Sequence, residues 1–260
     1  MSTQLHPALK MTYAQKMERT AHKRAALLDF LASGEVFTTV AMAAELLQLS
    51  EQTVQPLLKR LVAEQMLRVD TKAVPFSKTK LWGITAHGIA LSPSADPNCN
   101  EFRVGRTNPR FLDHHLDCQL VRIILQRKGW TNWVPDKLLR VENSKRLKKI
   151  PDALAIRPDG CRVALEIERN IKSKTRMTEM VAGHIHQMVG GHYDAVYFYT
   201  QHLAALKRVF QSVEVIRMDG FCVKISEDHR CQFIFMDIRM LKNAGTKLKI
   251  SGSVIFDPTL

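Results

Sequence analysis

The stretch PDALAIRPDGCRVALEIE, residues 151–168, decides the fold of the chain. It predicts two neighbouring β-strands joined by a tight turn, because Pro158 to Gly160 are residues that favour turns. Side chains alternate along a strand, so Glu166 and Glu168 are expected on one face of the second strand. Pairing of the two strands then brings Asp152 beside them, and three carboxylates gather at one place.

These three carboxylates predict a cation site. Bare like charges this close repel one another, so one of them would bind a proton unless a cation lies between them. Oxygen ligands suit hard divalent ions, and we expect Mg²⁺ or Mn²⁺ held by Asp152, Glu166 and Glu168. The alternative is that the acids are only solvated at the strand end, or paired with the arginines nearby in the sequence.

The composition bounds the class of protein. Among 260 residues, 45% are hydrophobic and 24% are charged, which is ordinary for a globular protein. The net charge of +13, from 38 Lys and Arg against 25 Asp and Glu, predicts attraction to polyanions, with nucleic acid first. No apolar run reaches the roughly 18 residues of a membrane helix, and no secretory signal opens the chain. The five cysteines are widely spread and predict reduced thiols, so we expect a cytoplasmic protein without membrane insertion.

The N-terminal part divides into a flexible basic segment, residues 1–18, and a small domain, residues 19–91. Helical spacing is expected over 21–31, and Thr39 and Ser50 are the predicted N-caps of a second and a third helix. Residues 67–70 and 81–85 are expected to be strands around a basic loop.

Three helices followed by a small hairpin resemble a winged helix-turn-helix domain, on the residues LLQLSEQTVQPLLKRLVAEQMLRV (46–69) and KLWGITAHGIAL (80–91). Pro56 departs from this pattern, since it removes a backbone donor inside the third helix. The alternative function of such a domain is protein contact. The resemblance implies DNA binding through the third helix, with base contacts in the major groove and phosphate contacts from the wing. The expected contacts are Gln52, Thr53, Gln55, Lys59 and Arg60 on the helix and Lys72, Lys78 and Lys80 in the wing.

A linker is predicted at 92–107, where Pro, Ser, Asn and Gly are frequent, and a second domain at 108–260. The second domain is expected to begin with a helix at 109–128 and a strand at 133–141, followed by the central pair of strands. A helix at 175–188 and a strand at 195–200 come next. The predicted class is α+β or α/β.

The order helix, three strands, helix, strand, with Pro-Asp at 151–152 and Glu166-x-Glu168, resembles the PD-(D/E)xK nuclease fold over about residues 108–200. The resemblance implies that Asp152 and Glu166 hold a divalent metal ion. Glu168 stands where many of these nucleases carry Lys, and Lys172 is the first candidate to replace that lysine. The catalytic set is therefore expected to be Asp152, Glu166, Glu168 and Lys172.

A nuclease-like domain behind a winged helix resembles the replication-relaxation group, and within it the MobC-type relaxases of mobilisable plasmids. This resemblance implies a bacterial, cytoplasmic protein that binds double-stranded and nicked plasmid DNA at a transfer origin and nicks one strand. An accessory mobilisation protein and a coupling protein are the further partners it implies. A non-catalytic replication or transcription regulator is the alternative, favoured by the missing motif lysine.

The basic turn before the central strands is expected either to hold the DNA backbone near the metal or to be a solvated run of charges. It contains Lys145, Arg146, Lys148 and Lys149. Water is the expected nucleophile, and Tyr193 is the alternative, because a phosphotyrosine would conserve the bond energy for rejoining. His114 is expected to be structural or to contact DNA, and His184 is ranked below the carboxylates as a metal ligand.

Overall fold

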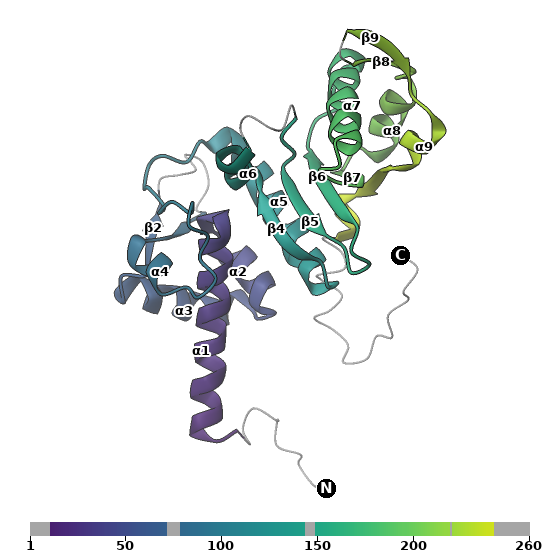
Figure 1. The fold of residues 1–260 in the computed structure, drawn as a ribbon. Helices are drawn as coiled ribbons and strands as arrows, with labels where there is room; N and C mark the ends of the chain where they lie inside the picture. The colour runs from purple at the N-terminus through teal and green to yellow at the C-terminus, as the bar shows by residue number, and fades with distance from the viewer. Residues whose placement is uncertain (1–10, 72–78, 144–148, 219, 242–260) are drawn as a thin grey trace, which may run out of the picture. The chain divides into compact units, whose positions relative to one another are not determined.

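The protein is described here by a computed structural model that covers residues 11–71, 79–143, 149–218 and 220–241. The chain forms two compact units, Met1–Pro109 and Arg110–Leu260. Both units combine helices with a β-sheet, which confirms the α+β class (Figure 1). Within the described residues, no helix is long and apolar enough to cross a membrane. All five cysteines lie in the described residues, and none of them forms a disulfide.

Unit 1 begins with a longer helix than the sequence predicted. Helix α1 (Tyr13–Phe30) starts in the segment expected to be flexible, because Thr12 and Gln15 form a reciprocal capping box at its start. The remainder of that segment, residues 1–10, lies outside the described residues. A π-helical turn, η2 (Leu31–Glu35), ends the helix, and Gly34 adopts a φ of 101° there, which only glycine tolerates well.

The next two helices agree with the prediction. Helices α2 (Val40–Leu47) and α3 (Glu51–Ala63) are capped by the Thr39 and Ser50 side chains. The apolar stripe of α3 is buried, as its spacing requires. Pro56 lies within α3 on the exposed side and does not end the helix.

A three-stranded antiparallel sheet completes unit 1. Strands β1 (Phe37–Thr38), β3 (Leu81–Ile84) and β2 (Leu67–Asp70) lie side by side in that order. The β2–β3 pair confirms the predicted hairpin, and helix α4 (Ala86–Ala90) follows directly behind the Thr85 cap.

The segment predicted to be a linker packs on unit 1 instead. Phe102 is 2% exposed, and its ring lies against Gly83 and 5.5 Å from the ring of Phe37. Arg68 of β2 pairs with Glu101 at 2.7 Å. The linker was predicted from the polar composition of the segment, which does not show that Phe102 is buried in unit 1. Unit 1 therefore extends to Pro109.

Unit 2 is built on a five-stranded sheet, whose strands lie in the order β10 (Phe233–Asp237), β7 (Ala195–Thr200), β6 (Arg162–Glu168), β5 (Ala153–Ile156) and β4 (Thr131–Pro135). Strands β4, β5 and β6 are antiparallel, whereas β6, β7 and β10 are parallel to one another. The central pair and its Pro158–Gly160 turn match the prediction, with Gly160 at a φ of 86°. The first elements of the unit are α5 (Pro109–Arg127), β4 (Thr131–Pro135), α6 (Asp136–Asn143), β5 (Ala153–Ile156) and β6 (Arg162–Glu168).

One predicted strand was wrong from Asp136 onward. The expected strand at 133–141 ends at Pro135, and helix α6 follows. The later elements are α7 (Lys174–Val189), β7 (Ala195–Thr200), α8 (Leu203–Gln211), β8 (Val215–Met218), β9 (Phe221–Lys224), α9 (Glu227–Cys231) and β10 (Phe233–Asp237). Helix α7 covers the sheet face that carries Ala164, Val196 and Phe198, and these side chains share one core with it.

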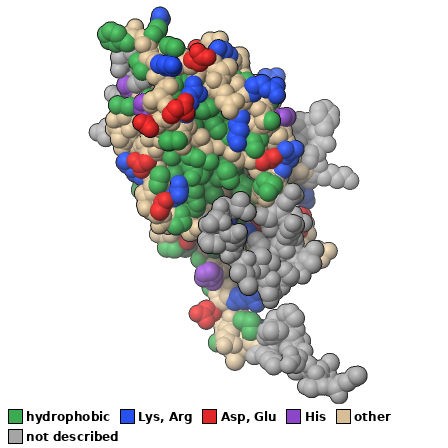
Figure 2. Space-filling view, turned by 90° about the vertical axis from the view of Figure 1, so that its right-hand side faces the viewer, with side chains coloured by type: hydrophobic (Ala, Val, Ile, Leu, Met, Phe, Trp, Pro, Cys, Tyr) green, Lys and Arg blue, Asp and Glu red, His purple; other side chains and the backbone are tan. Residues whose placement is uncertain are grey.

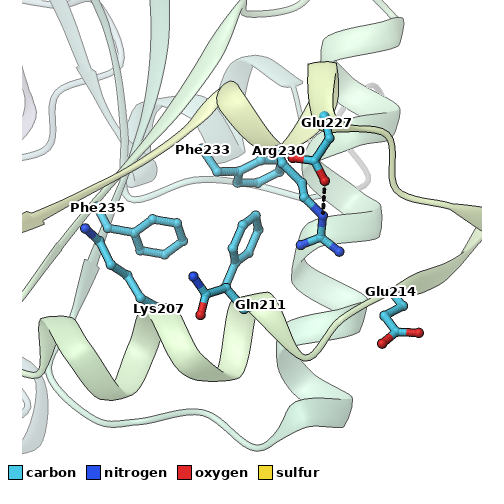
Figure 3. A pocket seen from close by; sticks show the side chains of 8 residues that line it. Lys207, Gln211, Glu214, Glu227, Arg230, Phe233 and Phe235 are labelled. Carbon is cyan, nitrogen blue, oxygen red and sulfur yellow. Dashed lines mark ion pairs between the residues drawn. The ribbon is translucent and has the colours of Figure 1, made fainter.

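A cavity adjoins the aromatic core of unit 2. Figure 2 shows hydrophobic side chains gathered over part of one face. A cavity of about 620 Å³ is lined by Phe210 of α8, Phe233 and Phe235 of β10, and the charged side chains of Lys207 and Arg230 (Figure 3). Arg230 lies over the Phe210 ring at 5.7 Å. None of the residues that line this cavity is a predicted site residue.

Candidate functional site

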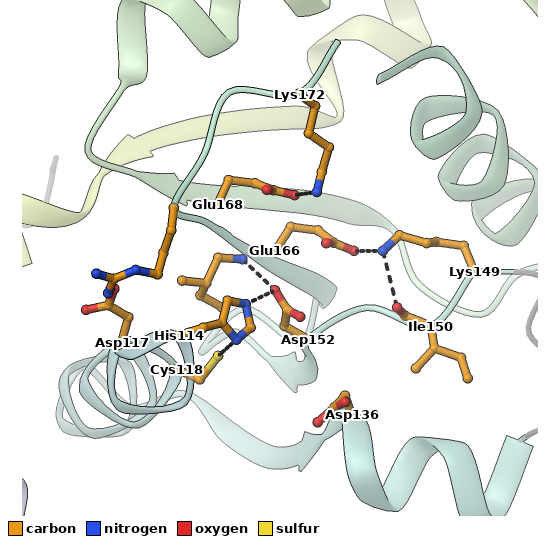
Figure 4. Close-up of polar contacts among 12 residues, drawn as sticks. His114, Asp117, Cys118, Asp136, Lys149, Ile150, Asp152, Glu166, Glu168 and Lys172 are labelled. Carbon is orange, nitrogen blue, oxygen red and sulfur yellow. Dashed lines mark hydrogen bonds and ion pairs between the residues drawn. The ribbon is translucent and has the colours of Figure 1, made fainter. Parts of the chain in front are cut away.

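The hairpin of β5 and β6 brings Asp152 and Glu166 together. In this hairpin Ala153 pairs with Leu165, and the Asp152 N–H donates a 3.0 Å hydrogen bond to the Leu165 carbonyl, so Asp152 lies beside the residue that precedes Glu166. The Asp152 carboxylate is also anchored, because its Oδ2 accepts a 2.8 Å hydrogen bond from the Ile167 N–H (Figure 4). The backbone thus fixes both acids before any other element contributes.

Glu166 is a buried carboxylate with two cationic neighbours. It is 3% exposed, and its Oε1 lies 2.8 Å from Lys149 Nζ and 3.1 Å from His184 Nε2. Burial by itself raises the pKa of Glu166, but His184 and Lys149 outweigh it and lower the pKa to about 2.

His184 contacts Glu166 through one ring nitrogen and a buried tyrosine through the other. Its Nδ1 lies 2.7 Å from the Tyr193 hydroxyl, and both side chains are almost fully buried. Burial raises the pKa of Tyr193. A hydroxyl held inside the core is poorly placed to attack a DNA phosphate, which argues against the tyrosine alternative.

Glu168 faces a different lysine. Its carboxylate lies 2.8 Å from Lys172 Nζ, so Lys172 does reach back to the strand as the sequence suggested. Burial raises the pKa of Glu168, and the charges of Glu166 and Asp152 add to this, against the opposing effect of Lys172. A small cavity of about 30 Å³ adjoins Glu168.

The three carboxylates do not form one tight cluster. Among the described residues, the trio whose ligand atoms all lie within 4.8 Å of one another is His114, Cys118 and Asp152. His114 Nε2 lies 3.2 Å from Asp152 Oδ2, and its Nδ1 lies 3.7 Å from Cys118 Sγ. The hydrogen bond to Asp152 is the main cause of a raised pKa for His114, and burial opposes it. Glu166 and Glu168 are instead each neutralised by a lysine.

The arginines near the hairpin do not neutralise these acids. Arg157 pairs with Asp159 at 2.8 Å, and Arg162 pairs with Asp194 at 3.1 Å. Arg169 turns to α5, where it contacts Asp117 and Asp113. The alternative of arginine-paired acids is therefore wrong for this hairpin.

The predicted DNA contacts fall into three groups. The helix residues are exposed along α3, although Arg60 also pairs with Glu64 at 2.8 Å, and Lys80 is exposed before β3. Lys149 was expected to hold DNA but is half-buried against Glu166. The remaining candidates, Lys72, Lys78, Lys145, Arg146 and Lys148, lie outside the described residues.

Sequence reasoning underestimated two histidines. His114 and Cys118 are four residues apart on α5, a spacing that places both on one helix face. His184 follows Met177 and Val181 along the buried stripe of α7, so its polar ring had to find a partner inside the core. Both spacings were visible in the sequence, but the partner carboxylates come from distant strands.

Comparison of the chain with models of protein families, with curated proteins and with solved structures found no match.

Proposed function

We propose that unit 2 is a divalent-metal-dependent nuclease domain of the PD-(D/E)xK type that nicks one strand of DNA, and that unit 1 is a winged helix-turn-helix domain that binds the DNA. The observation that carries the proposal is that the central hairpin brings Asp152 near Glu166, which lies 2.8 Å from a lysine (Figure 4). The nick at a plasmid transfer origin rests on the resemblance described above.

The topology of unit 2 supports the nuclease part. A helix, three antiparallel strands, a crossover helix and a parallel fourth strand follow one another as α5, β4, β5, β6, α7 and β7, with α6 inserted. The acids lie on the second and third strands, where the family carries them. In unit 1, three helices and the β2–β3 hairpin support the winged-helix part.

The residues at the hairpin fit a divalent cation. Glu166 carries a buried carboxylate whose pKa is lowered to about 2, so it is ionised, and the Asp152 carboxylate lies near it (Figure 4). Asp152 and Glu166 would hold the ion, which is expected to be Mg²⁺ or Mn²⁺. When bound, such an ion neutralises phosphate charge and lowers the pKa of a coordinated water.

The protein's own side chains supply the rest. Lys149, which lies 2.8 Å from Glu166, would donate to a phosphate oxygen and take the role of the lysine missing at position 168. Glu168, whose pKa is raised, is suited to accept a proton from the attacking water and pass it to solvent. Lys172 holds Glu168 in place at 2.8 Å.

The decisive experiment uses a supercoiled plasmid that carries the cognate origin. We expect conversion to the nicked circle with Mg²⁺ or Mn²⁺, which Asp152→Ala and Glu166→Ala abolish while DNA binding in a gel-shift assay persists. Asp159→Asn, in the β5–β6 turn, is the matched control and should nick normally. Nicking that survives both alanine variants would refute the proposal, and a protein–DNA adduct in an acid gel would reinstate a tyrosine.

A non-catalytic DNA-binding regulator is the second candidate. It is favoured by one observation, that lysines already neutralise Glu166 and Glu168 at 2.8 Å each. This candidate predicts specific binding of the origin without nicking by the wild-type protein under any divalent ion.

A further inference from the structure

Helix α5 brings a nitrogen and a sulfur ligand to the Asp152 carboxylate. His114 and Cys118 are one turn apart, and the imidazole lies between the thiol and the carboxylate, with contacts of 3.7 Å and 3.2 Å (Figure 4). All three residues are half-buried, and the His114 side chain is 34% exposed, so solvent ions reach the group.

The spacing of these atoms suits one metal ion. Zn–N, Zn–O and Zn–S bonds of about 2.0–2.3 Å separate neighbouring ligand atoms of a tetrahedral site by about 3.4–3.5 Å. One ligand atom from each residue lies within 4.8 Å of the other two, so small side-chain movements bring the three to that spacing. A cation uses one of the two ring nitrogens, so binding would replace one of these contacts by coordination.

The donor set differs in kind from the carboxylate pair. A thiolate and an imidazole favour borderline ions such as Zn²⁺ or Co²⁺, whereas Mg²⁺ is bound through oxygen. Three protein ligands with a solvent-accessible fourth position are typical of a zinc site that retains a water molecule.

We propose that His114, Cys118 and Asp152 form a binding site for a transition-metal ion of the Zn²⁺ class. The inference rests on the proposed function only in that Asp152 is shared with the carboxylate pair. Because Asp152 is shared, this site gives the hairpin a thiolate-containing metal environment, and Zn²⁺ and Mg²⁺ would compete for the same carboxylate.

The experiment titrates the metal-free, full-length protein with Co²⁺ and records its absorption. We expect one equivalent of Co²⁺ to give a sulfur-to-cobalt charge-transfer band in the near ultraviolet, which Zn²⁺ displaces. Cys118→Ser should abolish this band, and His114→Ala should weaken Co²⁺ binding by about tenfold or more. Cys161→Ser is the matched control, since Cys161 is also half-buried and forms no disulfide, and the band should be unchanged in this variant.

The readout is separate from nicking. Glu166→Gln should keep the charge-transfer band even where it removes nicking, because Glu166 is not a ligand of this site. Absence of the band in the wild-type protein, or a band that persists in Cys118→Ser, would overturn the inference and leave the nuclease proposal standing. A band in a wild-type protein that never nicks would support the site and refute the nuclease. Circular dichroism of each variant identifies loss of folding, and Cys118→Ala provides a second, apolar replacement.

Discussion

Glu166 is a carboxylate that stays ionised in the core of unit 2. An isolated buried charge is very costly, but Lys149 and His184 lie on the same oxygen and lower the pKa to about 2. Lys149 and His184 stabilise the folded state mainly because they prevent the cost of leaving the Glu166 carboxylate buried without a cationic neighbour. Removing a neighbour therefore costs more than the pair itself contributes.

Lys149→Met should destabilise the metal-free protein by about 1–3 kcal/mol, because Glu166 would lose its amine neighbour while Lys149 is itself 28% exposed. The free energy of unfolding in urea measures this. The double variant with Glu166→Gln should recover part of the loss. Lys174→Met, at an exposed position on α7, should have little effect, and equal losses in the two lysine variants would contradict the argument.

Asp194 gives unit 2 a dependence on pH. Hydrogen bonds from the backbone N–H and the guanidinium of Arg162 lower its pKa below the ordinary 3.8. A lowered pKa stabilises the folded protein above 3.8, and this contribution disappears as the pH falls further. Asp194→Asn should therefore lower stability by roughly a few tenths of a kcal/mol at pH 7, and the difference from wild type should shrink near pH 3. Urea unfolding at both pH values tests this, with the exposed Glu179→Gln as control.

At the residue scale, the sequence predicted the members of the hairpin and missed their neighbours. Asp152 and Glu166 could be paired because both lie in one local hairpin whose periodicity is fixed. His114 contacts Asp152 from 38 residues away, and no local rule gives such a contact. Lys149 was predicted to contact DNA because it belongs to a basic run, and such runs are usually exposed. In the structure it instead contacts the buried carboxylate of Glu166.

The boundaries of helices and strands were predictable where a capping side chain marks the start of a helix. The side chains of Thr39, Ser50 and Thr85 each accept a hydrogen bond from the backbone N–H three residues later in the chain. The predicted starts of α2 and α3 were confirmed. The strand predicted at 133–141 failed because Pro135 ends it and the residues of α6 are amphipathic at helical spacing. The start of α1 was missed because its first turns carry few apolar residues.

Pro56 weakens α3 without breaking it. It removes the donor to the Gln52 carbonyl and crowds that oxygen, yet the helix runs from Glu51 to Ala63. Pro56→Ala should stabilise unit 1 by about 1 kcal/mol or more, measured by thermal unfolding, since position 56 is exposed and tolerates the smaller side chain. A loss of stability would mean that the proline holds a geometry that the helix requires.

Phe102 binds the segment after α4 to the sheet of unit 1. Its ring occupies the space above Gly83, where an added Cβ would lie 1.9 Å from Phe102 Cγ. Phe102→Ala should cost about 3 kcal/mol of unfolding free energy. Gly83→Ala should also destabilise the wild-type protein, but cost much less in the Phe102→Ala background. Additive effects would show that the two residues do not meet.

At the scale of the whole molecule, the charge of +13 governs the expected response to salt. If unit 1 binds DNA through α3, the logarithm of affinity should fall linearly with the logarithm of salt concentration. Lys59→Ala should reduce that slope by about 1 and weaken binding to all sequences similarly. Fluorescence anisotropy over a salt series measures both, and Lys224→Ala, exposed on β9, is the control. An unchanged slope for Lys59→Ala would remove α3 from the DNA interface.

Strand β6 lies in the middle of the five-stranded sheet, bonded to β5 on one side and to β7 on the other. Interior strands exchange their amide hydrogens with deuterium only when a whole domain opens, whereas edge strands and terminal hairpins open alone. We therefore expect strand β6, which contains Glu166 and Glu168, to be among the last parts of unit 2 to unfold. Fraying at the β8–β9 hairpin or at the β10 edge would leave the spacing of the two acids undisturbed.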